Sequence, residues 1–159
     1  MEIVPDTNVF IAAMFEGDEH CRNILLAEHR GQCSFVLSIP CLDEVMMIFI
    51  RHALVFLEKG GGNLHEDFIK PQLELSRAWL RSRIVYPRIK QKFCTDPEDN
   101  KFIYAAIEGC ARYIISNDGM VLKLNRSVLN KAGQEIEVLQ PPHFNRLLLK
   151  HVKDTRTHA

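Results

Sequence analysis

The sequence predicts an α/β protein built on a central, mainly parallel sheet of five strands. Two observations lead to this fold class. Short apolar runs of strand length recur along the chain, and segments with a helical spacing of apolar residues separate one run from the next. Strands that are joined through helices form crossover connections, which give parallel pairing. The length of 159 residues fits one domain, and a hydrophobic content of 47% is enough for its core.

The five predicted strands are short apolar runs bounded by turn or helix signals. They are residues 3–4, 34–38, 84–86, 113–115 and 136–139. Pro87 closes the third run, because proline has no backbone N–H to donate to a sheet.

Helices are predicted between the strands and after the last one. Their ranges are 8–13, 19–29, 41–58, 66–80, 99–110, a short turn about 121–122, and 143–152. Pro40 suits a first helical turn, and the helix that follows is apolar nearly all round, which predicts that it is largely buried. The run Gly60–Gly62 ends that helix as a flexible linker. We expect one domain over residues 1–152 and a loose tail over 153–159.

Composition excludes several classes of protein. Twenty basic and twenty acidic residues cancel, so no bulk positive charge indicates a nucleic-acid partner. Five cysteines without a C-x-x-C pair indicate reduced, mostly buried thiols, as in cytosolic proteins. The N-terminus does not resemble a signal peptide, and the longest apolar stretch, Val45–Ile50, is too short to cross a bilayer. We therefore expect a cytoplasmic protein with no membrane partner.

Acidic side chains stand at the ends of several predicted elements. Asp6 and Asp118 directly follow strands, Glu44 lies early in a helix, and Asp96 and Asp99 open another helix. Ligands of parallel sheets bind beyond the carboxyl ends of the strands, so the topology carries these acids to one edge. Carboxylates that meet there repel each other unless divalent cations lie between them, and they suit hard cations such as Mg²⁺ and Mn²⁺.

Each acid also has a purely structural interpretation. Asp6 can cap a helix, and Asp118 can form a turn with the glycine that follows it. Asp96 is well placed to cap the next helix, with Asp99 as the capping-box acid. Glu44 can be a surface carboxylate at a favourable helix N-terminus. The convergence of Asp6, Glu44, Asp99 and Asp118 on one edge favours a shared site over separate structural roles. For Asp96 the capping role is the stronger interpretation.

Polar neighbours accompany the first and last of these acids. Thr7 and Asn8 follow Asp6, and Ser116 and Asn117 precede the last acid. Their hydroxyl and amide groups can hold the carboxylates in position or contact a ligand, although Asn8 fits a helix start equally well.

The stretch from Leu75 to Thr95 contains no acid but several basic residues. A phosphate-bearing substrate beside metal-filled acids needs such cations to follow its backbone. The candidates are Arg81, Arg83, Arg88, Lys90 and Lys92. The structural alternative is a solvated helix face and loop.

Four segments, in their order and spacing, resemble the PIN domain family. They are residues 4–9 (Val-Pro-Asp-Thr-Asn-Val), 40–44 (Pro-x-x-x-Glu), 96–102 (Asp-x-x-Asp-Asn-Lys-Phe, running on to two alanines) and 113–118 (Tyr-Ile-Ile-Ser-Asn-Asp). The resemblance covers about residues 2–150 and is strongest to the bacterial toxin-like subfamily that is related to the VapC ribonucleases.

The resemblance implies a three-layer α/β/α fold and a Mg²⁺- or Mn²⁺-dependent endoribonuclease that cuts single-stranded or structured RNA. The family's acidic positions correspond to Asp6, Glu44, Asp99 and Asp118, with Asp96 as an auxiliary ligand. Its supporting hydroxyl and amide positions correspond to Thr7, Asn8, Ser116 and Asn117. Toxin-like members are held by a small antitoxin, and a homodimer through the apolar helices is also expected. Ser116 departs from the family's usual threonine, and the long apolar helix and its glycine run are less usual.

Two other functions remain open at this point. The fold could serve as a catalytically silent protein- or RNA-binding module, although the presence of all four acids favours an enzyme. A metal-dependent nuclease acting on DNA, or a phosphatase, could use a similar sheet. The motif that begins at Asp6 reads Asp-Thr-Asn and lacks the Asp-x-Asp of an aspartyl-phosphate hydrolase.

Overall fold

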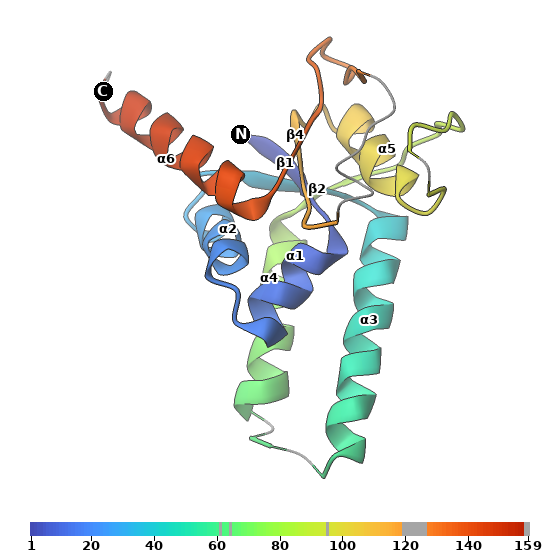
Figure 1. Cartoon of the computed structure of the whole chain (residues 1–159), viewed down its shortest axis with the longest axis vertical. Coiled ribbons are helices and arrows are strands. Elements are labelled where there is room, and N and C mark those ends of the chain that lie inside the picture. The colour runs from blue at the N-terminus through green and yellow to red at the C-terminus, as the bar shows by residue number, and fades with distance from the viewer. Residues whose placement is uncertain (61, 64, 95, 119–126, 158–159) are drawn as a thin grey trace.

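The predicted, mainly parallel sheet of five strands is confirmed by the computed structural model, in which all four strand pairings are parallel (Figure 1). It describes residues 1–60, 62–63, 65–94, 96–118 and 127–157, with side chains up to residue 151. The strands are β1 (Glu2–Pro5), β2 (Ser34–Ser38), β3 (Arg83–Val85), β4 (Tyr113–Ile115) and β5 (Glu137–Leu139), in the spatial order β3-β2-β1-β4-β5. The chain order reverses at β1, whose neighbours are β2 and β4, so a topological switch point lies at its carboxyl end.

In the described part of the chain, six α-helices and two π-helical turns lie between the strands and after the last strand. The helices are α1 (Thr7–Ile11), α2 (Glu19–His29), α3 (Ile39–Glu58), α4 (Lys70–Arg81), α5 (Asn100–Glu108) and α6 (Pro141–Thr157), and the π-helical turns are η1 (Ala12–Glu16) and η2 (His65–Ile69). Helix α6 runs to Thr157, so residues 153–157 are helical where a loose tail was expected. The helix expected about 121–122 lies outside the described residues.

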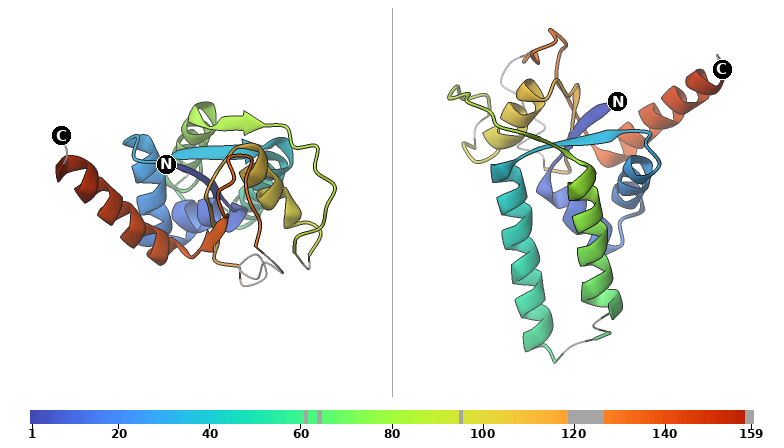
Figure 2. Two further views of the ribbon diagram at one scale, coloured as in Figure 1. Left: turned by 90° about the horizontal axis from the view of Figure 1, so that it is seen from above. Right: turned by 180° about the vertical axis from the view of Figure 1, so that it is seen from behind.

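Helices cover both faces of the sheet. Helix α5 packs on β1, β2 and β4, while α3 and α4 contact β2 and α1 packs on α3. Figures 1 and 2 show α5 on one side of the strands and α1, α3 and α4 on the other. The strands are buried accordingly, with Ile3, Phe35 and Ile114 fully inaccessible to solvent. Parallel strands covered on both faces need such continuous apolar runs, which explains their sequences.

The distal halves of α3 and α4 project beyond the sheet as a helical hairpin (Figures 1 and 2). Aromatic rings hold its inner side together. The ring of Phe49 lies 5.4 Å from those of Phe15 and Phe68, and His52 stacks on Phe15 at 4.8 Å between ring centroids. Phe15 of η1 therefore packs the hairpin onto the body of the protein, whereas Phe68 of η2 packs against α3 within the hairpin.

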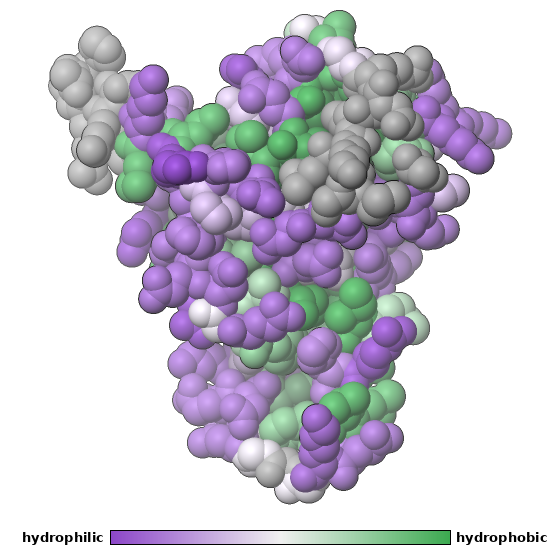
Figure 3. Space-filling model, in the orientation of Figure 1, coloured by the Kyte–Doolittle hydropathy of each residue, from purple (hydrophilic) through white to green (hydrophobic). Residues whose placement is uncertain are grey.

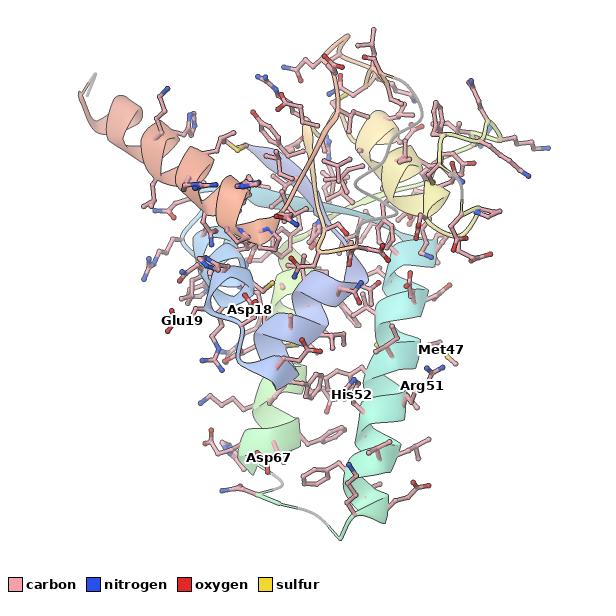
Figure 4. The ribbon with its side chains drawn as sticks, in the orientation of Figure 1. Asp18, Glu19, Met47, Arg51, His52 and Asp67 are labelled. Carbon is pink, nitrogen blue, oxygen red and sulfur yellow. The ribbon has the colours of Figure 1, made fainter. Side chains whose placement is uncertain are left out.

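The outer side of α3 is exposed, so the expectation that this helix is largely buried was wrong. Met47, Leu54 and Leu57 are 62%, 55% and 66% exposed, and Figure 3 shows apolar surface in this region. Figure 4 shows Met47 and Arg51 on the outer side of α3, and His52 on the side that faces η1. A helix that is apolar all round needs two partners to be buried, and the described part of the chain covers only one side of it.

The cysteines behave as buried thiols. Cys21, Cys33, Cys41 and Cys94 are buried, and all five cysteines are free. Burial raises the pKa of Cys21 and Cys33 to about 12, which keeps both thiols protonated. Among the described residues, no helix is long and apolar enough to cross a membrane.

Candidate active site

Asp6 is placed at the switch point by backbone and side-chain contacts. Its N–H donates to the carbonyl oxygen of Ile115 at 2.9 Å, which ties the end of β1 to the end of β4. Its carboxylate accepts hydrogen bonds from the backbone N–H of Asn8 and from the hydroxyl of Ser116. The residue is 2% exposed. Asp6 thus caps α1, as the structural interpretation held, and also lies in a buried polar contact between two strand ends.

Ser116 links the first and last acids of the sequence. Its hydroxyl donates to Asp6 and its oxygen accepts the backbone N–H of Asp118 at 2.8 Å. Asn117 differs from the expectation, because its amide points to the sulfur of Cys21 at 3.8 Å and not to the acids. The serine hydroxyl is therefore the group that orders this side of the site.

Electrostatic shifts show that the separate acids lie near one another. The pKa of Asp6 is raised to about 6, mainly by burial and further by the negative charges of Glu44 and Asp118. The pKa of Asp99 is also raised, mainly by burial and then by the charges of Asp96 and Asp118, with a smaller contribution from Glu44. The four acids and the auxiliary Asp96 therefore share one electrostatic neighbourhood at the carboxyl edge.

Lys101 enters this neighbourhood from α5. Its ammonium lies 2.6 Å from a carboxylate oxygen of Glu44, and the two side chains are 14% and 34% exposed. The same ammonium lowers the pKa of Asp99, which partly offsets the neighbouring acids. Lys101 thus compensates part of the negative charge that gathers at this edge.

The donor set fits a hard divalent cation, although the side chains are not closed around one point. The described residues contain no group of three or more His, Cys, Asp or Glu side chains in a metal-holding arrangement. The oxygens near Asp6 are nevertheless of the kind that Mg²⁺ and Mn²⁺ prefer. The hydroxyl of Thr7 is buried and has no hydrogen-bond partner within the described part of the chain, a cost that a ligand would remove.

Asn100 is a structural residue of the site that the sequence analysis missed. It is 1% exposed, and its side-chain oxygen accepts the backbone N–H of Phe93 at 2.7 Å. Its amide donates to the carbonyl oxygens of Asp96 and Pro97 at 3.2 and 3.1 Å. A buried amide thus holds the loop that presents Asp96 and Asp99. The signal was its position one helical turn before Ile103, on the apolar face of the predicted helix.

The helix after Asp96 begins later than predicted. Helix α5 starts at Asn100, with Asp99 at its N-cap position and a turn before it. The carboxylate of Asp96 accepts the N–H of Glu98 at 2.9 Å, so it caps that turn and not the helix. Asp99 makes no side-chain capping hydrogen bond at the start of α5, which leaves its carboxylate available at the edge.

The basic residues fall into two groups. The guanidinium of Arg81 binds the buried carboxylate of Glu28, and Arg83 pairs with Glu2 at 2.8 Å. Both arginines come before or at the start of β3, so they lie at the amino edge, away from the acids. The candidates that follow β3, on the acidic side, are Arg88, Lys90 and Lys92, all of them exposed.

Taken together, the fold and this edge define an α/β protein with clustered acids beyond the carboxyl ends of a parallel sheet. The PIN domain family matches residues 2–119, and the chain belongs to this family, whose members are typically nucleases. The chain matches no curated protein.

A solved structure supports the same fold. The chain is similar to one in the crystal structure of VapBC2 from Rickettsia felis bound to a DNA fragment from their promoter, with a TM-score of 0.52 and 12% sequence identity. The match covers 88% of this chain and 98% of that chain. At this level of identity the likeness shows the fold and does not show the function.

Proposed function

We propose that this protein is a metal-dependent endoribonuclease that hydrolyses phosphodiester bonds of single-stranded or structured RNA. The observation that carries the proposal is the buried Asp6, whose pKa is raised while Glu44 and Asp118 lie close enough to raise it further. Strongly shifted acids in one place are typical of functional sites. Membership of the PIN domain family supports a nuclease in particular.

In this proposal, Asp6, Glu44, Asp99 and Asp118 hold Mg²⁺ or Mn²⁺, and Asp96 lies at the margin of the set. When bound, the ion would offset charge on the phosphodiester and lower the pKa of water. The chain's own residues provide the frame. Ser116 holds the Asp6 carboxylate toward the edge, and Asn100 fixes the loop that carries Asp99.

The cations beside the acids have complementary roles. Lys101 sets the position of the Glu44 carboxylate and adds a positive charge where a phosphate would approach. Arg88, Lys90 and Lys92 lie on the exposed segment after β3 and would follow the backbone of the RNA. Arg81 and Arg83 have no part in this track, because both are paired at the opposite edge.

We further propose that the protein is the toxin component of a toxin–antitoxin system, inhibited by a small antitoxin protein and able to form a homodimer. The likeness to VapBC2 of Rickettsia felis supports this assignment. The exposed apolar side of α3 offers a surface for a partner chain. We also propose a cytoplasmic location, which the free cysteines support.

The test is cleavage of labelled RNA by the purified chain. We expect single-stranded RNA to be cut with Mg²⁺ or Mn²⁺ and to stay intact with EDTA. Matched single-stranded DNA and a small phosphoester, under the same conditions, distinguish a ribonuclease from a DNA nuclease and a phosphatase. RNA that stays intact with either metal, or that is cut equally with EDTA, would contradict the proposal.

One observation favours a second function, a catalytically silent binding module. The Glu44–Lys101 ion pair engages one of the four acids, and the described residues hold no preformed metal group. Thermal unfolding with Mn²⁺ separates the two functions, because a ligand that binds only the folded state stabilises it. A metal pocket predicts a melting temperature that rises with Mn²⁺ concentration, whereas a silent module predicts no change.

A further inference from the structure

A cavity lies on the same edge as the acids, beyond the ends of β2 and β3. Its volume is about 260 Å³. Apolar side chains form its walls and cations stand at its rim, namely Ile39, Pro40, Val85, Tyr86, Arg88 and Lys101. None of these residues belongs to the acidic set, so the cavity is a separate feature of the edge.

The aromatic residues of the cavity differ in how firmly they are held. The hydroxyl of Tyr104 donates to the carbonyl oxygen of Gln91 at 2.9 Å, which fixes this ring to the segment after β3. Tyr86 is 71% exposed and follows directly after β3. A large aromatic ring left in solvent, beside an apolar hollow, offers a stacking surface to a flat ligand.

The charged residues that line the cavity indicate which class of ligand fits it. Arg88 and Lys101 contribute positive charge to the lining, and no acidic residue lines the cavity within the described part of the chain. A nucleotide combines a flat base with an anionic phosphate, which matches an aromatic face flanked by cations. A purely apolar ligand would make no use of the charge of Arg88.

Lys101 connects this cavity to the acids. Its ammonium pairs with Glu44, and the same side chain lines the cavity. In the strand order, β2 is next to β1 and β3 is three strands from β4, so the ends of β2 and β3 lie one to three strand spacings, about 5 to 14 Å, from the ends of β1 and β4. A short stretch of single strand can reach from one to the other.

We propose that this cavity is a nucleobase subsite, in which a base of the substrate strand stacks on Tyr86 while Arg88 and Lys101 contact its phosphates. The inference rests on the proposed nuclease function and adds to it the recognition of a base next to the cleaved bond. Stacking on an aromatic ring tolerates any base, so the subsite would position the strand more than it would select a sequence.

The test is binding measured without cleavage. Fluorescence anisotropy of labelled single-stranded RNA, in EDTA, compares the wild-type chain with Tyr86→Ala, Tyr86→Phe and Leu80→Ala. Leu80 is 88% exposed on α4 and lies outside the cavity lining, so it controls for loss of an exposed apolar side chain. We expect roughly 5- to 100-fold weaker binding for Tyr86→Ala, and changes within about twofold for the other two variants.

Each other outcome overturns the subsite. Wild-type affinity in Tyr86→Ala would show that no base stacks there. Equal losses in Tyr86→Ala and Tyr86→Phe would assign the effect to the hydroxyl, and an equal loss in Leu80→Ala would make it unspecific. A wild-type chain that binds neither RNA nor matched DNA would also overturn it. Failure of the nuclease proposal is recognised separately, by RNA that is bound but not cut when Mn²⁺ is added.

Discussion

The two edges of the sheet differ in how the charges of their acidic side chains are compensated. At the amino edge, acids are matched one to one with arginines. The pairs are Glu2–Arg83, Glu28–Arg81 and Glu137–Arg112. At the carboxyl edge, four acids lie close together. Among the described residues, Lys101 forms an ion pair with one of them, Glu44.

The difference separates acids whose charge the chain itself compensates from acids whose charge a metal ion would compensate in the proposed function. A paired carboxylate is compensated by its own chain and contributes to stability or costs little. Asp6 is buried beside other carboxylates, so its pKa rises and its ionised form costs free energy. Proteins retain such costs at functional sites, where an external cation or substrate removes them.

The largest expected effect of this contrast is on cleavage. Asp6→Asn should lower metal-dependent RNA cleavage about a thousandfold, because the proposed metal site loses its buried carboxylate. Glu2→Gln at the amino edge should leave cleavage within about twofold of the wild type. Single-turnover cleavage rates in Mn²⁺ measure both. Equal losses in the two variants would erase the distinction between the edges.

The next effect concerns stability at the amino edge. Arg81→Met should lower the free energy of unfolding by about 3–4 kcal/mol, because it leaves the carboxylate of Glu28 buried without its partner. Glu28→Gln should cost only about 1 kcal/mol, because the Arg81 side chain is 39% exposed and can reach water. Urea unfolding at pH 7 measures both changes. Equal losses of unfolding free energy in the two variants would show that the burial of Glu28 does not determine the cost of breaking this ion pair.

A third prediction uses the pH dependence of the carboxyl edge. The folded chain holds the proton of Asp6 up to about pH 6, whereas the unfolded chain releases it near the ordinary value of 3.8. Between these values the folded state binds more protons, so this group's contribution to stability falls as pH rises. The loss is about 3 kcal/mol and is complete above pH 6 to 7.

Asp6→Asn cannot ionise, so it should escape this loss. Its free energy of unfolding, relative to the wild type and in EDTA, should increase between pH 4 and pH 7 and then stay level. Denaturant unfolding at several pH values measures the difference, and titrating groups away from the carboxyl edge cancel between the two proteins. A difference that is constant across this range would mean that the pKa of Asp6 is not raised.

The sequence was sufficient for the placement of the acids, and the reason is topological. Asp6 and Asp118 follow strands, and the ends of parallel strands share an edge whatever the details of packing. The same rule, applied to the basic stretch, would have excluded Arg81 and Arg83, which precede or begin β3. Grouping them with the cations after the strand ignored where the chain crosses the sheet.

Two features depended on packing that sequence patterns do not encode. The Glu44–Lys101 pair joins α3 to α5, and no spacing rule relates positions on different helices. The exposure of α3 was missed because an apolar pattern predicts contact but not whether this chain or another provides it. Asn100 was not identified because its contacts are to backbone groups of the preceding loop, and these contacts depend on the path of that loop.

The smallest expected effect tests whether Lys101 is a structural partner or a substitute for the metal. Lys101→Met should lower stability by about 1 kcal/mol in EDTA, because Glu44 loses a partly exposed ion pair. Arg83→Met at the amino edge removes a more exposed ion pair with Glu2 and should also cost about 1 kcal/mol. If the carboxyl edge binds a cation, saturating Mn²⁺ compensates the charge of Glu44 in place of the lysine. The loss of stability in Lys101→Met should then vanish, while the loss in Arg83→Met should stay. Calorimetric melting with EDTA and with Mn²⁺ measures the four differences from wild type. An unchanged cost for both variants would make the two edges alike and Lys101 an ordinary ion-pair partner.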